Sequence, residues 1–163
     1  LDRICKLMSD MYKQENVDII LGAAIGGILL SGCVGKHLNK KTIFTERVEG
    51  KMELRRGFEI KDNDRVLIVE DIVTTGGSIF ELIKVVEEHN GSVMGIVSIV
   101  NRSVDKINFG YEFKSLLEYP IQSYDTLKCP ECLMRDSESQ WDKHSIPPST
   151  PRNTSLKPPP SSS

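Results

Sequence analysis

Two adjacent carboxylic acids, Glu70 and Asp71, stand just before a short segment of glycines and hydroxyl-bearing residues that runs from Thr74 to Ser78. Glycines let main-chain amides approach a ligand closely, and a helix that begins at Ser78 would turn the positive end of its dipole toward this segment. The pattern therefore predicts a phosphate-binding loop, although it matches neither the P-loop nor the dinucleotide-binding glycine motif. The two acids would lie where they can accept hydrogen bonds from the hydroxyls of a phosphorylated sugar. The plainer interpretation, a solvated acid pair at a strand end, is weakened by the loop that follows.

Hydrophobic spacing predicts the elements that must position this loop. The predicted helices cover residues 4–11, 28–38 and 79–86. The predicted strands cover residues 17–21, 42–45, 66–69 and 93–100. Ser78 and Glu81 match a capping box for the third helix, and Asn90 with Gly91 is a typical stop signal.

Apolar strands that alternate with helices predict an α/β fold, with a parallel sheet covered by helices on both faces. Ligands of such sheets bind beyond the carboxyl ends of the strands. The strand at 66–69 ends abruptly at Glu70 and Asp71, so the acid pair is expected at that edge. The charged stretch that follows the predicted strand at 42–45 and continues to about Asp64 is expected to be irregular.

Composition argues against several classes of function. The chain has 163 residues and 18.3 kDa, with 21 Lys and Arg against 23 Asp and Glu, for a net charge of −2. This balance argues against nucleic acid as a partner. The longest apolar stretch, Ile19 to Val34, is interrupted by glycines and serine, which argues against a membrane span. Four cysteines and no signal-peptide pattern favour a soluble protein of the cytoplasm.

One compositional boundary divides the chain. Prolines and serines dominate from about residue 136 to residue 163, a composition that predicts disorder, and residues 1–135 form the predicted domain. The sequence begins at Leu1, inside what looks like an amphipathic segment, so the domain is expected to be truncated at its N-terminus.

The segment VLIVEDIVTTGGS, residues 66–78, resembles the signature of type I phosphoribosyltransferases that binds 5-phosphoribosyl 1-diphosphate (PRPP). Three further segments are similar to orotate phosphoribosyltransferases: DIILGAAIGGILLSG (18–32), IFTERVEGKMELRRGFEI (43–60) and IVSIVNRS (96–103). The resemblance covers roughly residues 1–133 and implies the Rossmann-like type I fold. It also implies a pentosyltransferase that uses PRPP, orotate and Mg²⁺ to make orotidine 5'-monophosphate and pyrophosphate in pyrimidine (UMP) biosynthesis.

The resemblance carries PRPP-binding roles to two segments. It implies that Glu70 and Asp71 hold the ribose 2' and 3' hydroxyls and that the loop after them takes the 5'-phosphate. The implied PRPP-binding residues of this segment are Glu70, Asp71, Ile72, Val73, Thr74, Thr75, Gly76, Gly77 and Ser78. The turn at Ala24, Ile25 and Gly26 corresponds to the pyrophosphate-facing loop. Enteric members carry an aromatic residue and a lysine in this turn, which this chain lacks.

A charged segment, Glu46 to Arg56, has the composition of either a solvated loop or a lid. In the family this loop closes over the active site, often from the neighbouring subunit, so the resemblance implies a homodimer. Arg47 and Lys51 fall on its basic positions and join the acid pair as implied catalytic residues. Further basic and histidine positions are occupied here by Val48 and Glu53, so catalysis is expected to depend strongly on Lys51.

Arg102 follows the last predicted strand and matches the family's orotate-binding arginine, with Thr74 as the second implied base contact. The alternative for Arg102 is an exposed ion pair with Asp105. The hood that covers the base in the family lies upstream of Leu1.

Two other functions stay open: a purine or uracil phosphoribosyltransferase, and a PRPP-sensing transcription regulator without catalysis. The pair Cys129 and Cys132 is a weak zinc candidate, because one pair with His144 does not complete a ligand set. Cys5 and Cys33 are predicted to be small core residues. His37 and His89 are predicted to interact with helix ends.

Overall fold

The computed structural model describes residues 1–122. Its helices are α1 (Asp2–Asp10), α2 (Gly26–Leu38) and α3 (Gly77–Glu88). Its strands are β1 (Ile19–Ala23), β2 (Lys41–Val48), β3 (Lys51–Leu54), β4 (Arg65–Val73), β5 (Ser92–Asn101) and β6 (Phe113–Glu118). The cysteine pair at 129 and 132, the domain boundary at 135 and the predicted disordered segment lie outside the described residues. None of the helices within the described part of the chain is long and apolar enough to cross a membrane.

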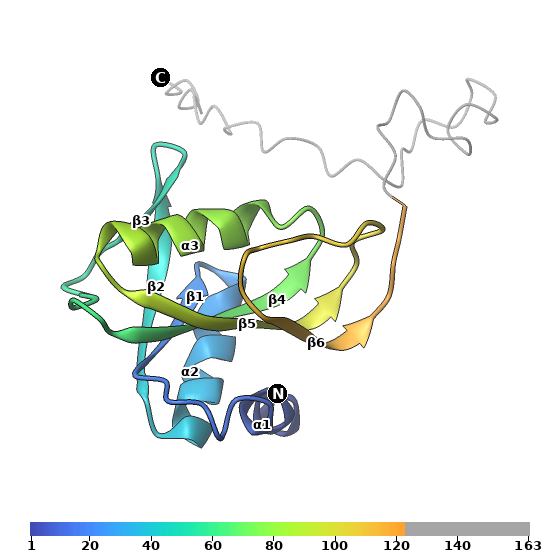
Figure 1. Ribbon diagram of the computed structural model, residues 1–163, viewed down its shortest axis with the longest axis horizontal. Helices are drawn as coiled ribbons and strands as arrows, with labels where there is room; N and C mark the ends of the chain where they lie inside the picture. Colours follow the sequence, from blue (N-terminus) through green and yellow to red (C-terminus); the bar gives the residue numbers. More distant parts are fainter. Residues whose placement is uncertain (123–163) are drawn as a thin grey trace, which may run out of the picture. The chain divides into compact units, whose positions relative to one another are not determined.

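The six strands form one sheet in the order β3-β2-β1-β4-β5-β6 (Figure 1). Strands β2, β1, β4, β5 and β6 run parallel, and only β3 is antiparallel, to β2. The chain leaves β1 through α2 toward β2 and leaves β4 through α3 toward β5, in opposite directions along the sheet. The crevice between the carboxyl ends of β1 and β4 is therefore the switch point at which such sheets bind ligands.

Helices cover both faces of the sheet, which confirms the predicted α/β fold (Figure 1). Successive strand residues point to opposite faces, so β1 and β4 supply two separate cores. One core joins the sheet to α3 and contains Leu21, Ile68, Leu82 and Ile96, all fully buried. The other joins it to α1 and α2 and contains Met8, Ile20, Leu67 and Val97, which are equally buried. Burial on both faces explains why these strands are apolar throughout.

Strand β4 does not end at Glu70, as its sequence predicts, but continues to Val73. Its last residues pair with β5, with Ile72 opposite Val100 and Val73 opposite Asn101. Main-chain pairing does not depend on side-chain polarity, so the two acids remain inside the strand.

The predicted capping box is also wrong. Helix α3 begins after Gly76, which has a φ of 77° and serves as the N-cap, and Ser78 lies inside the first turn. A positive φ suits glycine, because it has no Cβ to clash with the backbone. Glu81 reaches away from the helix end and forms an ion pair with Arg47, at 2.7 Å.

The charged stretch after residue 45 is not irregular but contains a β-hairpin, formed by the end of β2 and all of β3. Val48 pairs with Lys51, and the two residues between them, Glu49 and Gly50, have φ values of 49° and 85°. Positive φ at both positions is the mark of a type I′ turn, whose twist matches that of the flanking strands. Met52 and Leu54, on alternate positions of β3, pack against the α3-side core.

Candidate active site

The crevice at the switch point arises because β4 is longer than its neighbour. Pairing between β1 and β4 stops at Gly22 opposite Val69, whereas β4 runs on to Val73 along β5. From Glu70 onward, the edge of β4 that faced β1 has no strand beside it. Glu70 and Asp71 are therefore the first residues at the open side of the sheet.

The turn after β1 lies directly against the acid pair. It contains the cis peptide bond between Ala24 and Ile25, and α2 begins at Gly26. A Cβ atom at Gly26 would lie 2.6 Å from Oδ2 of Asp71, so the two segments meet with no room for a side chain. Ile25 points outward, with 86% of its surface exposed. The fold thus brings together the two segments to which the resemblance gives PRPP roles.

The two acids have different environments. Glu70 is buried, with 7% of its surface exposed, and its Oε2 atom has no hydrogen-bond partner within residues 1–122. Its Oε1 atom accepts a hydrogen bond from the main-chain N–H of Asp71, at 3.2 Å. Burial, assisted by a side-chain hydrogen bond with Asp71, raises the pKa of Glu70 to about 7. Asp71 is half-buried, and its Oδ1 accepts from the main-chain N–H of Ile72, at 2.7 Å. Glu70 is therefore not a solvated acid at a strand end.

The loop between β4 and α3 encloses a small pocket of about 60 Å³. Its lining is the loop itself with Glu70 and the first residues of α3: Glu70, Ile72, Val73, Thr74, Thr75, Gly76, Gly77, Ser78 and Ile79. No side chain caps the first turn of α3, so its main-chain N–H groups remain available to a ligand. Free N–H groups at a helix N-terminus favour an anion such as phosphate.

Strand β5 and the residue that follows it carry two further buried polar groups. Ser98 is fully buried and stands opposite Glu70 in the pairing of β4 with β5, and its hydroxyl has no hydrogen-bond partner in the described chain. Arg102 follows β5 and donates its main-chain N–H to the Val73 carbonyl, at 2.7 Å. Its Nε atom is buried and likewise unpaired within the same residues. Buried polar atoms are nearly always hydrogen-bonded in folded proteins, so this N–H group is available to a polar ligand.

None of the ion pairs within residues 1–122 joins Arg102 to Asp105. Ser98 is absent from the sequence-based predictions. The available signal was a single polar residue inside the otherwise apolar run at 93–100.

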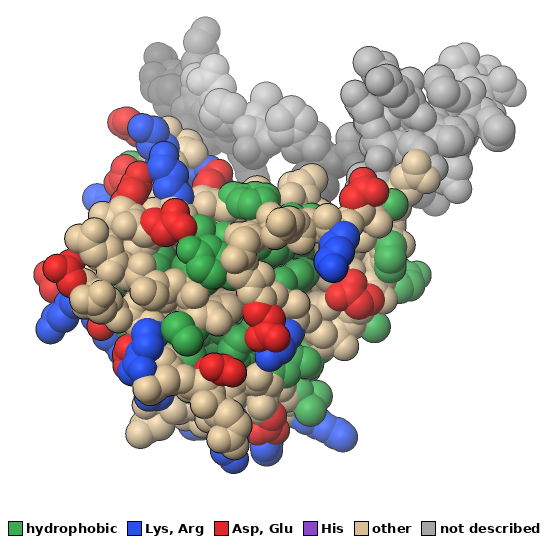
Figure 2. Space-filling view, viewed as in Figure 1, with side chains coloured by type: hydrophobic (Ala, Val, Ile, Leu, Met, Phe, Trp, Pro, Cys, Tyr) green, Lys and Arg blue, Asp and Glu red, His purple; other side chains and the backbone are tan. Residues whose placement is uncertain are grey.

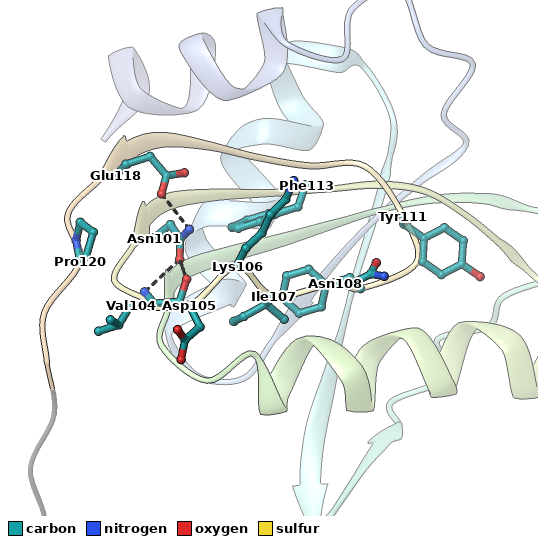
Figure 3. Close-up of a pocket in the computed structure, with 12 residues that line it drawn as sticks. Asn101, Val104, Asp105, Lys106, Ile107, Asn108, Tyr111, Phe113, Glu118 and Pro120 are labelled. Carbon is teal, nitrogen blue, oxygen red and sulfur yellow. Dashed lines mark hydrogen bonds between the residues drawn. The ribbon is translucent and has the colours of Figure 1, made fainter.

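A larger cavity, of about 850 Å³, lies under the loop between β5 and β6 (Figure 3). The side chain of Asn101 donates a hydrogen bond to Glu118, at 2.8 Å, and accepts one from the Ser103 hydroxyl, at 2.6 Å. Neither the acid pair nor Arg102 lines this cavity. Its size alone therefore does not make it the reactive centre.

The basic residues of the hairpin are not in contact with the acid pair. Arg47 donates to Glu81 on α3, at 2.7 Å, and to the carbonyl of Gly50, at 2.6 Å. The side chain of Lys51 is exposed and forms no hydrogen bond or ion pair with another described residue. Basic and acidic side chains are intermingled around the hairpin tip (Figure 2). The hairpin is therefore docked on α3 by a charge pair.

Comparison with known proteins decides which family this arrangement belongs to. A sequence profile of the phosphoribosyl transferase domain matches residues 1–123. The chain belongs to the phosphoribosyltransferase family. Within it, the predicted resemblance to orotate phosphoribosyltransferases is confirmed by relatives of that name.

Three such relatives span a range of similarity. The protein from Thermoanaerobacter sp. is 47% identical over 121 residues, which are 74% of this chain and 64% of the relative. That from Caldicellulosiruptor saccharolyticus is 40% identical over 131 residues, 80% of this chain and 69% of the relative. That from Thermotoga maritima is 37% identical over 156 residues, 96% of this chain and 78% of the relative.

Solved structures agree on the fold of this phosphoribosyltransferase. An adenine phosphoribosyltransferase from Thermoanaerobacter pseudethanolicus has a TM-score of 0.64 at 20% identity, covering 72% of this chain and 79% of its own. UMP synthase from Leishmania donovani has a TM-score of 0.62 at 23% identity, covering 72% of this chain and 26% of its own. At such identities the likeness concerns the fold and not the base that is used.

Proposed function

We propose that this phosphoribosyltransferase transfers the phosphoribosyl group of PRPP to orotate, which gives orotidine 5'-monophosphate and pyrophosphate. The reaction is a pentosyl transfer of pyrimidine (UMP) biosynthesis, and we assign it to the cytoplasm. The observation that carries the proposal is the buried, incompletely paired carboxyl group of Glu70, beside Asp71 and next to an uncapped helix N-terminus. These groups match a sugar that carries both hydroxyls and a phosphate.

Each part of PRPP has a complementary group in the crevice. The 5'-phosphate is assigned to the main-chain N–H groups of the loop from Thr74 to Ser78. The ribose hydroxyls are assigned to Glu70 and Asp71, whose carboxylate oxygens act only as acceptors when ionised. The pyrophosphate is assigned to the turn at 24–26, which touches Asp71 but offers no cationic side chain.

Magnesium fits the same crevice. Mg²⁺ prefers oxygen ligands and usually binds through one or two carboxylates together with substrate phosphates. Glu70 has an unpaired carboxyl oxygen and Asp71 is accessible from the crevice, so these are the residues that would hold the ion with PRPP. When bound, Mg²⁺ supplies positive charge to the leaving pyrophosphate.

Bond cleavage separates charge, and the chain has groups for both sides of the separation. As pyrophosphate leaves, the ribose becomes cation-like, and the carboxylates stabilise that positive charge. Arg47 and Lys51 are assigned to the departing pyrophosphate, and one well-placed group of this kind contributes about 3 to 4 kcal/mol. Arg47 must first leave Glu81, so the hairpin has to move before it can act. We assign the moving hairpin to the active site of the second subunit of a homodimer.

Arg102 and Thr74 are assigned to the base. Orotate differs from uracil by a carboxylate, and the buried Nε of Arg102 has no partner in the described chain. A charge-assisted hydrogen bond is worth about 1.5 to 3 kcal/mol, which corresponds to roughly 10- to 100-fold in preference for orotate.

The test is turnover of the full chain with PRPP, Mg²⁺ and one base at a time. We expect product with orotate, none with uracil, adenine or hypoxanthine, and no product in the presence of EDTA. Arg102→Gln should lower kcat/KM for orotate by about 10- to 100-fold while the Kd for PRPP is kept. Arg55→Gln, an exposed arginine of the hairpin region, is the matched control.

Two outcomes would overturn the proposal. Turnover of a purine or of uracil would make the protein a phosphoribosyltransferase with another base. Saturable PRPP binding without turnover of any base would favour a PRPP-sensing regulator.

A further inference from the structure

A cluster of metal-ligating side chains lies between α1 and α2, apart from the crevice. Asp2 comes from the first turn of α1, and Cys33 and His37 stand one turn apart on α2. One ligand atom from each residue lies within 4.8 Å of the other two. This is the only group of three such residues found within residues 1–122. It lies outside the machinery assigned to PRPP and orotate.

Packing of the two helices holds the cluster together. Cys33 and His37 share a face of α2 because residues four apart on a helix lie one above the other. α1 is fixed beside that face by buried residues of both helices, including Met8 and Val34. The Ser9 hydroxyl adds a long hydrogen bond to the Val34 carbonyl, at 3.4 Å. The ligand atoms therefore converge on rigid elements.

The existing contacts already resemble a ligand shell. Nε2 of His37 is hydrogen-bonded to Oδ1 of Asp2, at 2.9 Å. The Cys5 side chain, one turn after Asp2 on α1, is fully buried in the core against which Cys33 packs.

The donor set identifies the kind of ion. Imidazole nitrogen, thiolate sulfur and carboxylate oxygen together are ligands of Zn²⁺, whereas Mg²⁺ and Ca²⁺ take oxygen ligands. Tetrahedral bonds of 2.0 to 2.3 Å place ligand atoms roughly 3.5 Å apart, so the cluster needs only small side-chain movements. The side chains of Asp2 and His37 are 74% and 23% exposed, which leaves an entry path and a position for water.

The cluster is remote from the reaction assigned to this protein. His37 lies eleven positions after Gly26, the end of α2 that touches the acid pair. At 1.5 Å per residue this is about 16 Å along the helix axis. We propose that Asp2, Cys33 and His37 bind a Zn²⁺ ion that ties α1 to α2, with water as the fourth ligand. The site is too far from the crevice for the ion to contact the assigned substrates, so the role proposed for it is to hold the two helices together.

Cobalt(II) is the probe, because it replaces Zn²⁺ and absorbs light when it binds a thiolate. The background is the full chain with Cys129→Ser and Cys132→Ser, which removes the other thiol pair. We expect one equivalent of Co²⁺ to bind with a thiolate-to-metal absorption band, and Zn²⁺ to displace it. Cys33→Ser should abolish the band. His37→Gln should weaken Co²⁺ binding by at least about 10- to 100-fold, the range seen when only an outer-shell partner is lost.

Two further variants separate metal binding from folding. Asp2→Asn changes an exposed residue in the first turn of α1, and it should weaken Co²⁺ binding without loss of helical circular dichroism. His89→Gln is the matched histidine control, because His89 bonds the Val85 carbonyl at the end of α3 and should not affect binding. Absence of a thiolate band in the background protein, or its survival in Cys33→Ser, would overturn the proposal. This test does not depend on PRPP or orotate, so it fails separately from the proposed function.

Discussion

Glu70→Gln replaces a carboxyl group that folding removes from water and leaves with one unpaired oxygen. Folding raises the pKa of this group from 4.5 to about 7. Between these values the folded state binds more protons than the unfolded state, so the free energy of unfolding falls as pH rises. The free energy of unfolding falls by about 1.4 kcal/mol for each pH unit between the two pKa values, so above pH 7 the ionised Glu70 lowers it by about 3 kcal/mol. It vanishes below pH 4.5, where both states are protonated.

We therefore expect Glu70→Gln to raise the free energy of unfolding at pH 8 by up to about 3 kcal/mol, without PRPP present. The gain should shrink steadily as pH is lowered to 4.5. Urea titrations of both proteins at several pH values measure it, and Glu59→Gln, an exposed acid, should differ from the parent by less than about 0.5 kcal/mol. A Glu70→Gln protein that is equally stable or less stable at pH 8 would refute the argument. The same variant should lose the thermal stabilisation by PRPP.

Three further predictions concern the loop and the hairpin. Gly76→Ala and Gly110→Ala should each lower the free energy of unfolding by at least about 1 kcal/mol in urea titrations, because both glycines have a φ near 80°. The loss should be larger for Gly76→Ala, since only a Cβ at Gly76 would meet an aromatic ring, at 2.7 Å. Glu81→Gln should speed hydrogen exchange of the hairpin amides by freeing Arg47, yet change stability by less than about 1 kcal/mol because the pair is half-exposed. Lys51→Ala should lower kcat by about 100- to 1000-fold in steady-state assays and leave the Kd for PRPP nearly unchanged.

The sequence is most informative where hydrophobic pattern and local geometry agree. The runs at 66–69 and 93–100 have no polar face apart from Ser98, and they are central strands buried on both sides. The glycine-rich segment before α3 is the predicted loop against a helix N-terminus. Its neighbour across the crevice, the turn at 24–26, lies against Asp71. These features depend on short segments, so a single sequence is enough to find them.

Features that depend on pairing between distant segments could not be predicted in this way. The continuation of β4 through Glu70 requires β5 as a partner, and polar residues conceal it from a search for apolar runs. Strand β6 pairs with β5 at the edge of the sheet, and the apolar pattern of the sequence predicts no strand at 113–118. The hairpin left a weaker signal, since Met52 and Leu54 alternate with charged residues as in a half-buried strand. The ion pair between Arg47 and Glu81 joins residues far apart in sequence.

The longer reach of β4 has a thermodynamic consequence for ligand binding. Glu70 and Asp71 are carried by a hydrogen-bonded strand, so their main chain gives up little freedom when a sugar arrives. The hairpin, in contrast, must break a surface charge pair and settle in a new position before its cations can help. Most of the entropic penalty of forming the reactive complex should therefore arise when the hairpin closes. Changes in the hairpin should then alter the rate of the reaction more than the affinity for the sugar.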